Sequence, residues 1–117
     1  MAVFASRQIV MPATPIAVTI TGSGDSSGCY AIINGTKQYE AGTHEVNTGD
    51  TIIFGVYGPS SKAYGVVNID GTEVLKVTDR TTQTYEWTAP NGISTVEIEM
   101  SVGHKPNNSG RIIVTTA

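Results

Sequence analysis

Short runs of β-branched residues, separated by turn signals at intervals of about eight to twelve residues, constrain the fold of this chain most strongly. Two of these runs are joined by Asn34-Gly35 and two by Asp70-Gly71. Both dipeptides supply the positive φ angles that two-residue type I′ hairpin turns require. We therefore predict two tight hairpins, and we interpret the repeated "NGT" and "DGT" as turn chemistry rather than as a ligand-binding motif.

The strand runs predict an all-β protein. The clearest is at residues 94–102, where apolar and polar residues alternate, with Val96, Ile98, Met100 and Val102 on one face. Residues 51–57, "TIIFGVY", are nearly all β-branched or aromatic, which favours a central strand buried on both faces. The spacing of the runs is typical of an antiparallel immunoglobulin-like β-sandwich, here of about seven to nine strands.

The chain has 117 residues, the length of one domain, and its sequence falls into two segments. Residues 16–117 are predicted to form a single β-sandwich domain, and residues 1–15 an N-terminal arm or an edge strand. Prolines interrupt this first segment and disfavour continuous strand pairing. Its apolar side chains are candidates for docking on a neighbouring subunit: Phe4, Ile9, Val10 and Met11.

Charge and hydropathy exclude several classes of function. The net charge is −3 and the seven basic residues are scattered, which argues against nucleic-acid binding. No apolar run approaches the ~18 residues of a membrane-spanning helix, and the N-terminus lacks the pattern of a secretory signal peptide. Cys29 is the only cysteine, so no intrachain disulfide is expected, and its apolar surroundings predict a buried thiol.

Catalytic and metal-binding motifs are not found in the sequence. Neither a GxSxG nor an HExxH pattern occurs. Glu97 and Glu99 are interpreted as solvent-facing residues of a strand. The aspartates of the loops are interpreted as turn formers, with a calcium site assembled from two loops as the alternative: Asp25, Asp50, Asp70 and Asp79. We predict a non-enzymatic protein without a cofactor or a metal.

Tyrosines beside loops are the best candidates for a binding surface. Tyr39, Tyr57 and Tyr64 border turns of the predicted sandwich. Exposed aromatic rings stack on sugars, so these residues are candidate contacts for a glycan or a protein partner. Packing of the same rings at one end of the sandwich is the alternative interpretation.

From Tyr30 onward the chain resembles the small immunoglobulin-like domains of phage virions and bacterial surface proteins. The segments that carry the resemblance are "YAIINGT", "GTHEVNTGDTIIFGVYG", "GVVNIDGTEV", "TYEWTAP", "STVEIEMS" and "GRIIVTT". It implies an accessory virion protein, made in the host cytoplasm, that decorates a capsid or associates with a tail or fibre, with a homo-oligomer as one arrangement. A carbohydrate-binding module that recognises cell-surface glycans is the alternative.

Two stretches also resemble the copper-binding cupredoxins, "VNTGDTIIF" and "SVGHKPNNSGRIIVT". The resemblance implies a cupredoxin-like topology as an alternative fold. It does not carry the copper ligands, because Val102 or a neighbour takes the place of the cysteine and Asn108 or Ser109 that of the axial methionine. Blue copper requires two histidines beside the thiolate, and only His104 matches.

Overall fold

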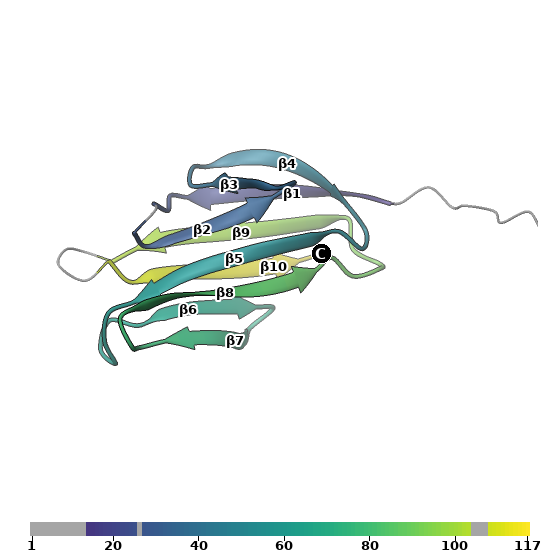
Figure 1. Ribbon diagram of the computed structural model, residues 1–117. Helices are drawn as coiled ribbons and strands as arrows, with labels where there is room; N and C mark the ends of the chain where they lie inside the picture. The colour runs from purple at the N-terminus through teal and green to yellow at the C-terminus, as the bar shows by residue number, and fades with distance from the viewer. Residues whose placement is uncertain (1–13, 26, 104–107) are drawn as a thin grey trace, which may run out of the picture.

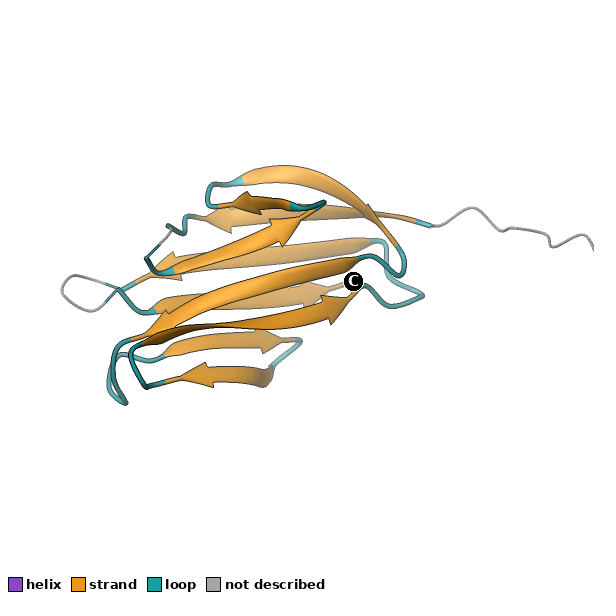
Figure 2. Ribbon diagram, viewed as in Figure 1, coloured by secondary structure: helices purple, strands orange, loops and turns teal. Residues whose placement is uncertain are grey.

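The computed structural model describes residues 14–25, 27–103 and 108–117. Within these ranges, ten strands form two sheets that pack face to face (Figures 1 and 2). The strands are β1 (Pro15–Gly22), β2 (Cys29–Ile33), β3 (Thr36–Gln38), β4 (Gly42–Asn47), β5 (Thr51–Gly58), β6 (Gly65–Ile69), β7 (Thr72–Val77), β8 (Thr81–Thr88), β9 (Thr95–Val102) and β10 (Gly110–Thr116). The same part of the chain contains no helix long and apolar enough to cross a membrane.

The strand order confirms an all-β sandwich and differs from the prediction in detail. One sheet has the order β4-β1-β9-β10-β6-β7, and the other has the order β3-β2-β5-β8. The pairs β1–β9 and β10–β6 are parallel, so the larger sheet is mixed rather than antiparallel throughout. Parallel neighbours need a long crossover, and the strands of the smaller sheet, which lie between β1 and β9 in the chain, supply it (Figure 1).

Both predicted hairpins are confirmed. Asn34 and Gly35 have φ angles of 52° and 79°, and Asp70 and Gly71 have 50° and 83°. Two successive residues at positive φ are what a type I′ turn requires, and asparagine, aspartate and glycine tolerate this region best. The first turn joins β2 to β3, and the second joins β6 to β7.

The core lies between the two sheets and is built from aliphatic side chains. Along β9, Val96, Ile98 and Met100 are buried while the residues between them are exposed, as the alternation predicted. From the smaller sheet, Phe54 enters the core, and its ring lies 6.3 Å from that of Trp87. Burial of each large aliphatic side chain contributes ~1.5–3 kcal/mol to the driving force for folding.

The prediction that β5 is buried on both faces is wrong. Ile52, Phe54 and Val56 are fully buried, but Ile53 and Tyr57 on the other face are only partly covered. The reason is that β5 is central within a sheet whose outer side has no further layer over it in the described part of the chain (Figure 2).

The first strand begins at Pro15, next to the predicted domain boundary. Beside it, Thr48 donates its backbone N–H to the Thr14 carbonyl at 2.9 Å. Residues Phe4, Ile9, Val10 and Met11 lie outside the described residues, so their role as a docking arm stays a prediction.

Candidate functional site

The outer side of the four-stranded sheet carries an aromatic and apolar surface, which we call the tyrosine face. It consists of partly buried side chains from β2 and β5, together with one residue after β3: Tyr30, Ile32, Ile53, Tyr57 and Tyr39. Tyr30 is paired with Gly55, and Ile32 with Ile53. Residues paired in this way share one face of the sheet, so these side chains are neighbours. On the edge strand β8, the same face continues with Thr82, Thr84, Glu86 and Thr88, and Glu86 is paired with Ile53.

Tyr30 is fixed over the sheet by three neighbours. A Cβ atom on Gly55 would lie 2.3–2.7 Å from three atoms of the Tyr30 ring, so the ring occupies the space that glycine leaves. The ring of Tyr39 meets it in an edge-to-face arrangement, with 6.3 Å between centroids and 69° between planes. The Lys37 ammonium lies 4.6 Å from the Tyr30 centroid. The ring is therefore held between Gly55, Tyr39 and Lys37.

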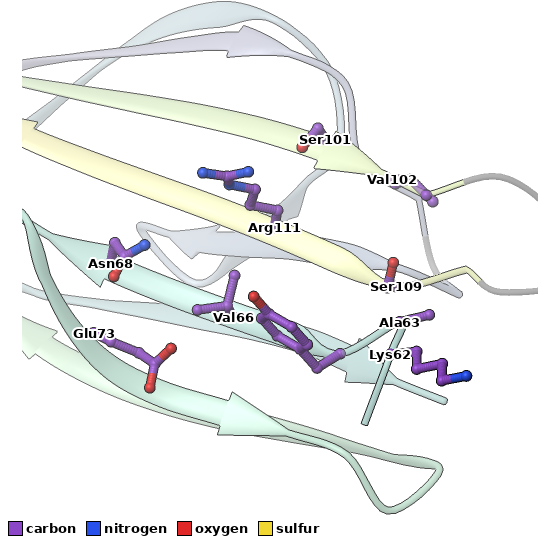
Figure 3. A pocket seen from close by; sticks show the side chains of 11 residues that line it. Lys62, Ala63, Val66, Asn68, Glu73, Ser101, Val102, Ser109 and Arg111 are labelled. Atoms are coloured by element: carbon purple, nitrogen blue, oxygen red, sulfur yellow. The ribbon is translucent and has the colours of Figure 1, made fainter. Parts of the chain in front are cut away.

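A hollow of about 380 Å³ lies on the outer side of the other sheet (Figure 3). We call it the sheet hollow. Two rows of paired residues cross β9, β10, β6 and β7 at this place: Ser101, Arg111, Val66 and Lys76 in one row, and Glu99, Ile113, Asn68 and Glu73 in the next. In Figure 3, Arg111 of β10 lies between Ser101 of β9 and Val66 of β6. The hollow is thus built on a regular sheet surface.

The wall of the sheet hollow is the loop between β5 and β6, and close backbone packing at its two ends holds it in place. A Cβ atom on Gly58 would lie 1.7 Å from the carbonyl oxygen of Val77. One on Gly65 would lie 2.6 Å from the carbonyl oxygen of Tyr57. Only glycine permits backbones to approach this closely. The loop therefore starts and ends at positions set by strand packing.

Inside the loop, one serine organises the backbone. The Ser60 hydroxyl oxygen accepts hydrogen bonds from the N–H groups of Lys62 and Ala63, at 3.3 and 3.0 Å. Such a turn fixes the direction of the chain over the next residues. Lys62, Ala63 and Tyr64 consequently line the hollow as its wall.

Positive charge gathers around the sheet hollow although the chain is acidic overall. Three of the seven Lys and Arg residues surround it: Lys62, Lys76 and Arg111. The Lys76 ammonium lies 4.4 Å from the ring centroid of Tyr64, which is itself 40% exposed. Glu73 lines the opposite side on β7 (Figure 3). The hollow thus combines a guanidinium, an exposed aromatic ring and a carboxylate.

The three predicted tyrosines are divided between the two sheets. Tyr39 and Tyr57 belong to the tyrosine face, whereas Tyr64 lines the sheet hollow on the other side of the sandwich. The loop after Tyr57 crosses from one sheet to the other, so the two ends of "YGPSSKAYG" do not form one platform. The sequence reasoning did not single out Tyr30 or Arg111, although each alternates with buried residues along its strand.

No match to this chain is found among protein-family models, curated proteins or solved structures.

The remaining candidate groups have structural partners. Each loop aspartate accepts a hydrogen bond near a turn: Asp25 from Ser27, Asp50 from Asn47, Asp70 from Thr116 and Asp79 from Thr81. The bonds of Asp25, Asp50 and Asp79 are local and agree with the interpretation of these residues as turn formers, whereas the bond of Asp70 joins its hairpin to β10. Among the described residues, no group of three or more His, Cys, Asp or Glu side chains is placed to hold a metal ion.

Two of these groups have displaced pKa values. The hydroxyl and the backbone N–H of Thr116 donate to the Asp70 carboxylate at 2.6 and 2.8 Å and lower its pKa. Cys29 is fully buried, as predicted, and burial raises the pKa of its thiol to about 11. Glu97 and Glu99 are exposed on the outer side of β9.

Proposed function

We propose that this chain is a non-enzymatic accessory protein of a phage virion, which decorates the capsid or associates with a tail or fibre through protein–protein contacts of the tyrosine face. The observation that carries the proposal is the cluster of Tyr30, Ile53 and Tyr57 on a sheet surface over which the described residues place no further layer. Aromatic residues are enriched in protein interfaces, and the charged side chains of this face, Lys37 and Glu86, border the cluster. The resemblance of the strand and turn segments to virion domains supplies the class of partner.

The contacts of Tyr30 favour a protein partner over a sugar at this face. A sugar stacks on an open ring, but the Tyr30 ring has the backbone of Gly55 beneath it and the Lys37 ammonium over it. The branched side chains of Ile32 and Ile53 lie beside it and add apolar area without hydrogen-bonding groups. Such a surface suits the side chains of another protein better than the hydroxyls of a glycan.

The proposal is tested on purified particles of the phage that encodes the chain. Peptide mass spectrometry is expected to find the protein in the particles, and its absence would refute the proposal. Purified wild-type protein should rebind to particles from which it has been stripped or deleted. Ile53→Glu is expected to reduce this rebinding at least about tenfold, because it buries a charge in the contact.

A matched control comes from the other sheet. Ile113 is also partly buried, on the outer side of β10, so Ile113→Glu makes the same chemical change away from the tyrosine face. It is expected to rebind like the wild type. If Ile113→Glu and Ile53→Glu lose binding equally while both remain folded, the tyrosine face is not the contact surface. Deletion of residues 1–13 tests the docking arm separately, since undiminished attachment would contradict that role.

A further inference from the structure

We propose that the sheet hollow binds a carboxylate-bearing sugar residue, a uronic or sialic acid unit of a surface glycan or polysaccharide. The hollow and the tyrosine face lie on opposite sides of the sandwich. Glycan binding at one is therefore independent of protein contacts at the other.

The charge of the hollow selects an anionic ligand. Arg111 presents a guanidinium from the row that forms the floor, and the planar fork of its N–H groups matches a carboxylate in two parallel hydrogen bonds. Lys62 on the wall and Lys76 against the Tyr64 ring add two further positive charges. Glu73 lines the β7 side, and Glu99 lies one row from Arg111. The carboxylate of the ligand is therefore expected at the guanidinium of Arg111, with Lys62 on the other side of the hollow (Figure 3).

The remaining lining groups match the body of a sugar ring. Tyr64 is 40% exposed and offers an aromatic surface for the apolar C–H groups of the ring. Val66, which also lines the hollow, is 6% exposed and supplies an apolar floor. Around these, Asn68, Ser101 and Ser109 provide an amide and two hydroxyls that both donate and accept hydrogen bonds, as sugar hydroxyls require.

The size and shape of the hollow support a single sugar unit rather than a buried cofactor. Its volume of about 380 Å³ lies near the lower end of the ~300–1,000 Å³ of small-molecule sites. It lies on the outer surface of a sheet, where a unit within a longer polysaccharide can reach it. An acidic peptide shares the carboxylate but lacks the ring and hydroxyls that Tyr64 and Asn68 are placed to meet.

Nuclear magnetic resonance titration of the full chain tests this proposal with charged and neutral ligand pairs. Sialyllactose is compared with lactose, and trigalacturonate with its methyl ester, so that the two sources of the carboxylate are separated. We expect at least one acid to shift the backbone amides around Arg111 and Ser101, and its neutral counterpart to bind at least about tenfold more weakly. An acetylated glutamate dipeptide is titrated in parallel, to test whether an acidic peptide binds instead of a sugar acid.

Variants locate the site on the protein. Arg111→Gln and Tyr64→Ala change exposed side chains, and each is expected to weaken binding of the acid about tenfold. Lys37→Gln is the control, because Lys37 also lies over a tyrosine ring, but on the tyrosine face. It should bind like the wild type.

Three results would overturn the proposal. The first is no shift with either acid at about 10 mM ligand, a concentration that reveals a Kd near 1 mM. The second is equal binding by Arg111→Gln and the wild type. The third is binding of the glutamate dipeptide without binding of either sugar acid, which would assign the hollow to a peptide.

Discussion

Replacing Gly55 with alanine would place a methyl group 2.3–2.7 Å from three ring atoms of Tyr30, well inside the ~3.5–4.0 Å at which carbon atoms pack. The ring must then leave its place over the sheet. A tyrosine side chain buries ~150–250 Å² when fully covered, and Tyr30 is only partly covered, so roughly 100 Å² is at stake. At ~25 cal/mol per Å² this amounts to about 2.5 kcal/mol. Part of this free energy is recovered when the displaced ring packs elsewhere. We therefore expect Gly55→Ala to lower the free energy of unfolding by ~1–3 kcal/mol.

The same substitution is expected to have the opposite sign once Tyr30 is removed. In a Tyr30→Ala background the new methyl group no longer meets a ring. Gly55 is not at positive φ, so alanine fits its backbone without strain. Gly→Ala at such a position raises the free energy of unfolding by ~0.4–1 kcal/mol, because the unfolded chain has less freedom to lose. The coupling free energy between positions 30 and 55, the difference between these two effects, is then ~1.5–4 kcal/mol.

Guanidinium unfolding of the wild type, both single variants and the double variant measures this cycle. The fluorescence of Trp87, the only tryptophan, follows the transition, because its ring packs against the core beside Phe54. The reasoning would be refuted if Gly55→Ala changed stability by the same amount and in the same direction in both backgrounds. That outcome would mean that the Tyr30 ring does not occupy the space over Gly55 in solution.

Three further predictions concern other parts of the fold. Hydrogen bonds from Thr116 lower the pKa of Asp70, so the ionised carboxylate stabilises the fold above its ordinary pKa of 3.8. This stabilisation is lost as the pH falls through the lowered pKa. Asp70→Asn should therefore melt at a lower temperature than the wild type at neutral pH, and the difference in melting temperature should shrink in acid. Gly58→Ala should lower the free energy of unfolding in urea by ~3 kcal/mol or more, because its Cβ would lie 1.7 Å from a backbone oxygen. Gly42→Ala is the control and should leave this free energy nearly unchanged, because the nearest atom to its Cβ would be 3.7 Å away. Cys29 should react with a thiol reagent only after unfolding, since burial raises its pKa to about 11, and fast labelling of folded protein would contradict this.

Local features of the fold could be predicted because they depend on neighbours in the sequence. The turn at Asp70-Gly71 needs only two residues that tolerate positive φ. The inward face of β9 follows from the alternation of Val96 and Ile98 with glutamates. The predictions that failed depended on which strand or layer lies next to a given strand. The sequence of β5 does not reveal that its outer face stays uncovered, nor do β1 and β9 reveal that they pair in parallel.

The candidate sites were less accessible to sequence reasoning, because register and distance in the chain decide them. Tyr64 and Arg111 line one hollow although 47 positions separate them. Tyr30 becomes part of a surface only because a glycine of β5 lies opposite it, and that pairing cannot be read from either strand alone. Tyrosines next to loops were a useful signal, but the signal did not assign Tyr57 and Tyr64 to different sheets.

The parallel pairing of β1 with β9 and the antiparallel pairing of β10 with β9 place the start of β1 and the end of β10 at the same end of the sandwich. Pro15, where β1 begins, and Ala117, bonded to Thr95, are both at that end, while Ser101 and the sheet hollow are at the other (Figure 1). A tether, tag or carrier joined at Ala117 would thus hold the domain by one end, with the sheet hollow on its side and nearer to the opposite end. Immobilisation through Ala117 should therefore leave the hollow accessible on a sensor chip.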